Sequence, residues 1–215
     1  MQLQLSIEVK TIYSHINKSA ISSLPKVLFK DRVIVIQSVS EARRAVDYLL
    51  TFQQVGIDTE TRPNFKPGGM NPVALLQVST LTTCFLFRLN YIGLPDSLLY
   101  LLGSMGPRKI GLSLHDDWAQ LQRRASFEPG NYVELQEYVK KLGIQDMSLQ
   151  KLYANIFGQK ISKAQRLTNW EADVLTEAQK RYAATDAWAC LRLFDEVNRM
   201  LRDRDFELIT TEQLS

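Results

Sequence analysis

The most regular pattern in the sequence is a helical segment near its end, Thr176–Leu201. Its apolar residues recur at close to the about 3.6 residues of a helical turn, so one face has to be buried. Small residues on this segment, Ala183, Ala184, Ala187 and Ala189, let that face approach a neighbouring element closely. The chain therefore has to supply a layer on which a long helix can pack.

β-Branched and apolar runs supply such a layer. The expected strands are Val33–Gln37, Val55–Glu60, Val73–Ser79, Cys84–Leu89 and Lys109–Leu114. Thr-rich turn residues separate the third and fourth strands, which predicts a hairpin. Further helices are expected from Ser40 to Leu50 and over Ser97–Leu102, Asp117–Ala125, Val133–Val139 and Ser148–Phe157, with Ser148 as N-cap. The Pro- and Gly-rich segment Thr61–Pro72 is expected to be a loop, and the mixed order of elements predicts an α/β layered domain.

Composition restricts the class of protein further. The chain has 215 residues, 45% of them hydrophobic, and 26 Lys and Arg against 23 Asp and Glu give a formal charge of +3. This charge is too small to indicate a nucleic-acid-binding protein by itself. The sequence shows neither a membrane-spanning run nor a secretory signal, and Cys84 and Cys190 lie in apolar surroundings. We therefore expect a globular protein of the cytoplasm with two free, buried thiols.

Two acidic residues interrupt an otherwise apolar strand. Side chains alternate along a strand, so Asp58 and Glu60 project from the same face. Two like charges this close raise each other's pKa unless a cation lies between them, and such oxygen ligands suit Mg²⁺ or Mn²⁺. The alternative is a frayed strand end that faces water, and this pair alone does not exclude it.

Two other groups of residues contain acidic side chains that could join this pair in one site. Tyr182 and Asp186 share one face of the late helix, because they are four positions apart in the sequence. Asp116 and Asp117 lie where an expected strand runs into a helix, and either Asp116 or His115 can cap that helix. Each group has an ordinary structural explanation when it is taken alone.

Together the three groups resemble the DEDDy branch of the DnaQ-like 3′–5′ exonucleases, with ribonuclease D and Werner-type exonuclease domains as the most similar members. Val73–Gln77 matches the family's second strand, and Ser148-Leu149 with Leu152 matches its Ser-Leu helix. Lys163, Arg166, Thr168–Trp170, Leu175-Thr176 and Tyr182–Ala187 match its late segment. The resemblance covers roughly Val33 to Val197 and implies a ribonuclease H-like fold, with a central five-stranded mixed sheet flanked by helices.

The resemblance also implies the site. Four metal-binding acids fall on Asp58, Glu60, Asp117 and Asp186, and the family's tyrosine falls on Tyr182. Asp117 is chosen over its neighbour Asp116 because Trp118 and Leu121 follow it at the family's spacing, and Asp116 remains the alternative. These residues would hold two ions, Mg²⁺ or Mn²⁺, for hydrolysis from a 3′ end to nucleoside 5′-monophosphates.

A group of acids repels a polyanion, so nearby cations have to attract the substrate. The candidates for substrate binding are Arg62 and Lys66 after the acidic strand, Lys160, Lys163 and Arg166 before the late helix, and Phe65, which can stack on a base. The expected partner is single-stranded or frayed nucleic acid with a free 3′ end, and DNA is favoured over RNA.

The expected organisation is an N-terminal arm over residues 1–24, an exonuclease domain over residues 25–203 and a C-terminal tail over residues 204–215. Two other functions stay open: an inactive nucleic-acid-binding or scaffold module of the same fold, and a phosphohydrolase of small nucleotides. Replacement of a catalytic acid would favour the scaffold, yet all five positions of the family pattern are filled.

Overall fold

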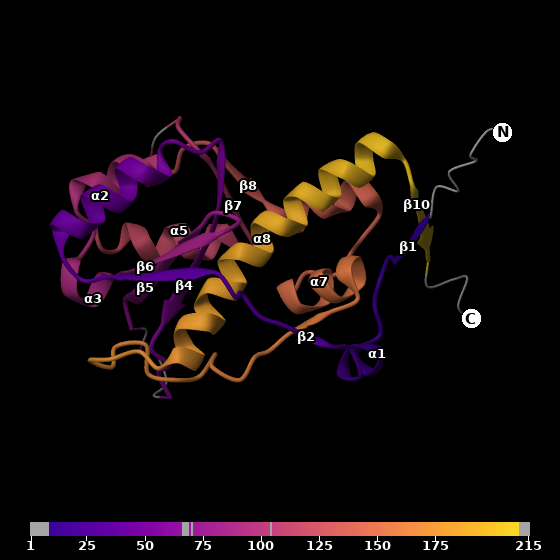
Figure 1. Cartoon of the computed structure of the whole chain (residues 1–215), viewed down its shortest axis with the longest axis horizontal. Coiled ribbons are helices and arrows are strands. Elements are labelled where there is room, and N and C mark those ends of the chain that lie inside the picture. Colours follow the sequence, from indigo (N-terminus) through magenta and orange to yellow (C-terminus); the bar gives the residue numbers. More distant parts are fainter. Residues whose placement is uncertain (1–8, 66–68, 70, 104, 211–215) are drawn as a thin grey trace.

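A mixed six-stranded sheet forms the centre of the protein in a computed structural model, which describes residues 9–65, 69, 71–103 and 105–210 (Figure 1). The strand order is β3-β6-β5-β4-β7-β8. Strand β5 runs antiparallel to β4 and β6, whereas β3 pairs with β6, β7 with β4 and β8 with β7 in parallel. Its strands are β3 Arg32–Ile36, β4 Gln54–Thr61, β5 Val73–Ser79, β6 Thr83–Arg88, β7 Arg108–Gly111 and β8 Tyr132–Glu134.

Two further pairs of short strands lie outside this sheet. Strand β1 (Lys10–Tyr13) pairs in parallel with β10 (Phe206–Ile209), and β2 (Lys26–Val27) pairs in parallel with β9 (Lys160–Ile161). The α-helices are α1 Lys18–Ser22, α2 Val39–Leu49, α3 Leu89–Ile92, α4 Asp96–Gly103, α5 Leu114–Gln122, α6 Leu135–Tyr138, α7 Leu149–Phe157 and α8 Glu177–Asp203, and Val139–Leu142 is a 3₁₀ turn.

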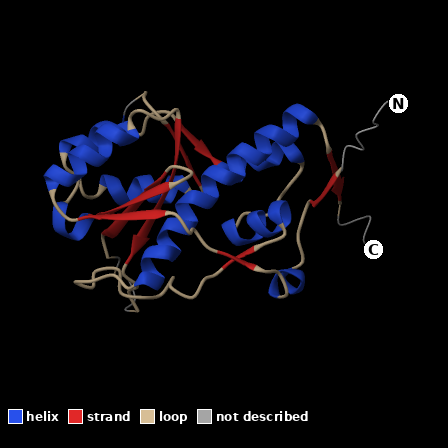
Figure 2. Cartoon of the chain, viewed as in Figure 1, coloured by secondary structure: helices blue, strands red, loops and turns tan. Residues whose placement is uncertain are grey.

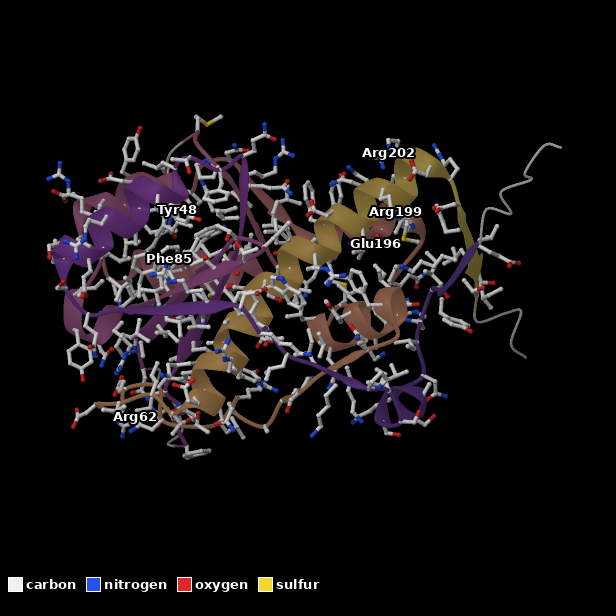
Figure 3. The ribbon with its side chains drawn as sticks, in the orientation of Figure 1. Tyr48, Arg62, Phe85, Glu196, Arg199 and Arg202 are labelled. Atoms are coloured by element: carbon white, nitrogen blue, oxygen red, sulfur yellow. The ribbon has the colours of Figure 1, made fainter. Side chains whose placement is uncertain are left out.

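Helices cover both faces of the sheet (Figure 2). Helix α8 crosses one face and contacts β4, β5, β6 and β7. Helices α2, α4 and α5 cover the other face, where one apolar cluster joins them to Val55 and Ile57 of β4 and to Phe85 of β6. Tyr48 of α2 packs on Phe85 with ring centroids 5.7 Å apart (Figure 3). The α/β class and the flanking helices predicted from the sequence are confirmed.

The alternation along β4 decides which side chains meet α8. Val55 and Ile57 face the α2 cluster, so Gly56, Asp58 and Glu60 point toward α8. A Cβ atom on Gly56 would lie 1.9 Å from the carbonyl oxygen of Ala187. The absence of a side chain at Gly56 is therefore what allows α8 to lie directly on this strand.

The sheet has one strand more than the five expected. Tyr132–Glu134 pairs with Lys109–Gly111 of β7 and forms the edge strand β8, although Val133 and Glu134 were expected to begin a helix over Val133–Val139. The helix starts only at Leu135. The tertiary pairing overrides the local helical pattern, as it commonly does for so short a segment.

Two helix starts also differ from expectation. Helix α2 begins at Val39 and not at Ser40, because Ser38 is its N-cap and forms a reciprocal capping box with Glu41. Helix α5 begins at Leu114, and Ser113 occupies the N-cap position, so neither His115 nor Asp116 caps it. Both Asp116 and Asp117 consequently lie in its first turn.

The two segments expected to be an arm and a tail meet at one end of the molecule (Figure 1). Lys10 of β1 donates to Glu196 of α8 at 2.6 Å, and Arg199 donates to Glu196 at 3.0 Å and also pairs with Asp205. Glu196 and Arg199 lie on the C-terminal half of α8, near Arg202 (Figure 3). This network ties the described part of the N-terminal segment to the main helix.

None of the described helices has the length and apolar character that a membrane span requires. The two cysteines, Cys84 and Cys190, are buried and unpaired, as predicted.

We predict that Gly56→Ala lowers the free energy of unfolding by about 2 kcal/mol, because the new methyl group forces α8 away from β4. Urea denaturation measures the change. Gly103→Ala is the control, since its Cβ would meet only the carbonyl oxygen of Glu128, at 3.2 Å. Equal stability of the Gly56 variant and wild type would show that the close contact does not exist.

We also predict a pH-dependent loss in Glu196→Gln. Hydrogen bonds from Arg199 and Lys10 lower the pKa of Glu196 from 4.5 to about 2, so its ionised form stabilises the fold above pH 4.5. The variant should lose about 1 kcal/mol at pH 7, and the difference should shrink as the pH falls from about 4.5 to 2. Thermal denaturation at pH 7 and pH 3 tests this, and a constant difference would contradict it.

Candidate metal centre

Three carboxylates converge where α8 crosses β4. Asp58 and Glu60 project from β4, and Asp186 projects from α8, one residue before the Ala187 carbonyl that touches Gly56. One oxygen of each acid lies within 4.8 Å of the others, and no other group of three metal-ligating side chains is this close among the described residues. The structure thus brings together three of the four acids that the family resemblance assigns to one site.

These acids are held largely out of water. Glu60 is 9% exposed and Asp186 is 6% exposed. Burial raises the pKa of Glu60 to about 9, and the charges of Asp186 and Asp117 add to this effect. Burial likewise raises the pKa of Asp186 to about 7 and holds that of Asp58 well above its usual range. Without a cation, the protein has to keep protons on these groups to relieve their repulsion.

Asp117 lies beside the three acids and not among them. It accepts a hydrogen bond of 2.5 Å from the Thr59 hydroxyl. Burial raises its pKa to about 7, against the effect of that hydrogen bond, and its charge raises the pKa of Asp58. Asp116 is exposed. Of the two adjacent acids, only Asp117 is thus directed to the site.

The start of α5 fixes the position of Asp117. Ser113 has a left-handed backbone (φ 62°) and makes no side-chain cap. Instead, the Glu134 carboxylate accepts from the backbone N–H groups of Ser113 and Leu114 at 3.0 and 2.6 Å. The role of Glu134 as the cap of α5 was not predicted, because no local pattern reveals a cap that lies about twenty residues further along the chain.

Tyr182 and two cations line the open side of the site. The Tyr182 hydroxyl donates to Asp186, and burial together with the surrounding acids raises the pKa of this phenol. Lys163 and Arg166 line a cavity of about 350 Å³ with Tyr182 and Asp186. The charge of Lys163 lowers the pKa of Asp186, and that of Arg166 lowers the pKa of Glu60.

The other substrate-binding candidates that the structure describes do not line this cavity. The Arg62 guanidinium pairs with Glu171 at 3.0 Å (Figure 3). Phe65 is 84% exposed. The Lys160 ammonium donates to the backbone carbonyl of Ser22 and does not line the cavity beside the acids. Lys66 lies outside the described residues.

The donor set fits a hard divalent cation. All the candidate ligand atoms are carboxylate oxygens, which Mg²⁺ and Mn²⁺ prefer. Asp186 Oδ1 is buried and has no hydrogen-bond partner, so it offers a free lone pair inside the site. A carboxylate oxygen left in this state is costly unless it binds a cation.

Comparison with known proteins also relates this chain to 3′-5′ exonucleases. A family described as 3′-5′ exonuclease matches residues 33–202. The chain is 32% identical to the mouse bifunctional 3′-5′ exonuclease/ATP-dependent helicase over 68% of its own length, but spans only 11% of that protein. It is 25% identical to an Arabidopsis thaliana 3′-5′ exonuclease over 90% of its length and 73% of that protein.

Solved structures share the fold. The exonuclease domain of Aedes aegypti Nibbler superposes with a TM-score of 0.72 at 19% identity and covers 82% of this chain and 91% of that one. Escherichia coli ribonuclease D superposes with a TM-score of 0.67 at 18% identity over 84% of this chain and 52% of that one. The expected ribonuclease H-like fold is thereby confirmed.

We predict that Asp186→Asn stabilises the metal-free protein at high pH. The folded-state pKa of Asp186 is raised from 3.8 to about 7, so the wild type loses stability relative to the variant as the pH rises through that range. The difference should be negligible near pH 4 and at least about 1 kcal/mol at pH 8.5. Calorimetry in EDTA measures it, and a wild type as stable as the variant at pH 8.5 would contradict the burial of this carboxylate.

Proposed function

This chain belongs to the 3′–5′ exonuclease family, and from this premise we propose that it removes nucleotides one by one from the 3′ end of nucleic acid as nucleoside 5′-monophosphates. The observation that carries the proposal is the convergence of Asp58, Glu60 and Asp186, whose ligand oxygens lie within 4.8 Å of one another. The unsatisfied Asp186 Oδ1 inside this group supports cation binding.

The four acids would together bind two ions, Mg²⁺ or Mn²⁺. Asp58, Glu60 and Asp186 would hold one ion, and Asp58 with Asp117 would hold the second. When bound, such a pair supplies an acidified water for in-line attack and stabilises the leaving 3′ oxygen. The protein's contribution is the rigid placement of the ligands, because Gly56 and Ala187 fix α8 against β4.

Tyr182 would act as a hydrogen-bond donor in this reaction. Its raised pKa means that the phenol keeps its proton at neutral pH, so it cannot serve as the general base. Its hydroxyl points to Asp186 and can orient a water bound beside that carboxylate. A neutral donor orients this water without adding charge to the site.

Lys163 and Arg166 would attract the phosphates. They line the cavity next to Tyr182 and Asp186, so they place positive charge beside the acids that would repel a polyanion. Contacts of this kind read the backbone and not the bases, which predicts salt-dependent binding without sequence preference. Arg62 would contribute only after it leaves Glu171, with which it is paired, whereas the exposed Phe65 could stack on a base.

DNA is the favoured substrate, as a single strand or a frayed end. The match to DNA polymerase I of Aquifex aeolicus, 26% identical over 77% of this chain, supports DNA. We also propose a cytoplasmic location, because both thiols are free.

We predict that the wild type shortens 5′-labelled single-stranded DNA from the 3′ end in Mg²⁺ or Mn²⁺ and is inactive in EDTA. Asp58→Ala and Asp186→Ala should each lower the rate by several orders of magnitude while the fold is kept. Tyr182→Phe should lower it less, because only one donor is lost. Denaturing gels with DNA and RNA of matched sequence measure direction and preference.

The same assay separates the alternatives. A scaffold module would bind the oligonucleotide and leave it intact in every metal, whereas a small-nucleotide phosphohydrolase would cleave dinucleotides faster than long strands. Asp116→Ala is the matched control, because this exposed neighbour of Asp117 does not face the site. Activity that survives EDTA, or shortening from the 5′ end, would refute the proposal.

A further inference from the structure

Gln77 on β5 is a buried polar residue that the proposed reaction does not use. Its side chain is fully buried, and both atoms of its amide, Oε1 and Nε2, lack a hydrogen-bond partner. An unsatisfied amide is costly in a protein interior, and native structures keep few of them. Its position in the sheet suggests why this chain keeps one.

Gln77 is the cross-strand partner of Asp58. The antiparallel register of β4 and β5 places the two residues directly opposite each other, so their side chains share the face that α8 covers. Directly opposite residues have Cβ atoms about 5 Å apart, within the reach of a glutamine amide. Helix α8 lies above this face and contacts both strands (Figure 1).

The other neighbours of Gln77 on the sheet are apolar or weaker acceptors. On the opposite side, its cross-strand partner on β6 is Leu86, and along its own strand the same face carries Leu75. Ser79, the other neighbour along its own strand, donates its hydroxyl to the Thr80 carbonyl and offers only a neutral oxygen as acceptor. Asp58, directly opposite, offers a carboxylate, which forms the stronger hydrogen bond.

The surroundings also disfavour a water molecule as the partner. Leu75 and Leu86 belong to one apolar cluster with Ala183 and Ala184 of α8. A buried water needs about two to four polar partners, and the leucine and alanine side chains of this wall supply none. The amide is left between an apolar wall and one carboxylate.

We propose that Gln77 is a positioning residue for Asp58: when the divalent cations are bound, its free amide donates to one carboxylate oxygen and fixes the rotamer in which the other oxygen faces the cations. The inference rests on the proposed function. Such second-layer partners orient metal ligands in other proteins and strengthen metal binding. A neutral amide suits this role, because a Lys or Arg here would compete with the cations for the same carboxylate.

Replacement of Gln77 by methionine tests the inference, because methionine has nearly the same shape and no amide. Titration of the Gln77→Met chain, residues 1–215, with Mn²⁺, without nucleic acid and followed by electron paramagnetic resonance, should show a Kd at least about tenfold higher than in wild type. In single-stranded DNA cleavage, kcat at fixed Mn²⁺ should fall while KM for the DNA stays unchanged. The melting temperature in EDTA should be equal or higher, since the unsatisfied amide is gone.

Two further variants complete the design. Leu86→Met changes the packing on the other side of Gln77 and should bind Mn²⁺ like wild type. Gln77→Asn keeps an amide on a shorter side chain and should give an intermediate Kd, and it also serves if the methionine variant does not fold.

The outcomes separate two failures. If wild type binds Mn²⁺ and the Gln77 variants bind it equally well, Gln77 does not position Asp58 and only this inference is wrong. If wild type binds no Mn²⁺, the proposed function fails and the inference fails with it. A loss of Mn²⁺ affinity that Leu86→Met shares would show a packing effect and would also overturn the assignment.

Discussion

The packing of α8 on β4 is the constraint on which the rest of the structure depends. Because Gly56 has no side chain, the backbone of Ala187 rests directly on the strand, and Asp186 is placed over Asp58 and Glu60. Burial raises the pKa values of all three carboxyl groups, and the charges of neighbouring acids raise those of Asp58 and Glu60 further. The tight interface that stabilises the domain thus creates a site that lacks a positive charge.

Neutral hydrogen-bond donors direct the acids, and the positive side chains are kept at the rim. Thr59 donates to Asp117 and Tyr182 donates to Asp186, and Gln77 is proposed to do the same for Asp58. Lys163 and Arg166 line the adjoining cavity. This separation leaves the carboxylates free to bind cations while the rim can attract phosphates.

The sequence predicted what short-range periodicity determines. Alternation along a strand put Asp58 and Glu60 on one face, and helical spacing put Tyr182 and Asp186 on another, as the structure has them. The resemblance to a known family supplied what periodicity could not, namely that these faces meet.

Features that depend on distant partners could not be predicted. Glu134 sets the start of α5 from about twenty residues away, and the strand Tyr132–Glu134 exists only through its pairing with β7. Arg62 and Lys160 looked free in the sequence, but Glu171 and the Ser22 carbonyl engage them. The sequence gives the charge of such residues but not the direction in which their side chains point.

The most direct test is anomalous diffraction from a crystal of the wild-type protein soaked in Mn²⁺. The account predicts anomalous density between the carboxylates of Asp58, Glu60 and Asp186, with their oxygens as ligands. A well-ordered site without that density, or with Lys163 or Arg166 turned inward to neutralise the acids, would contradict it.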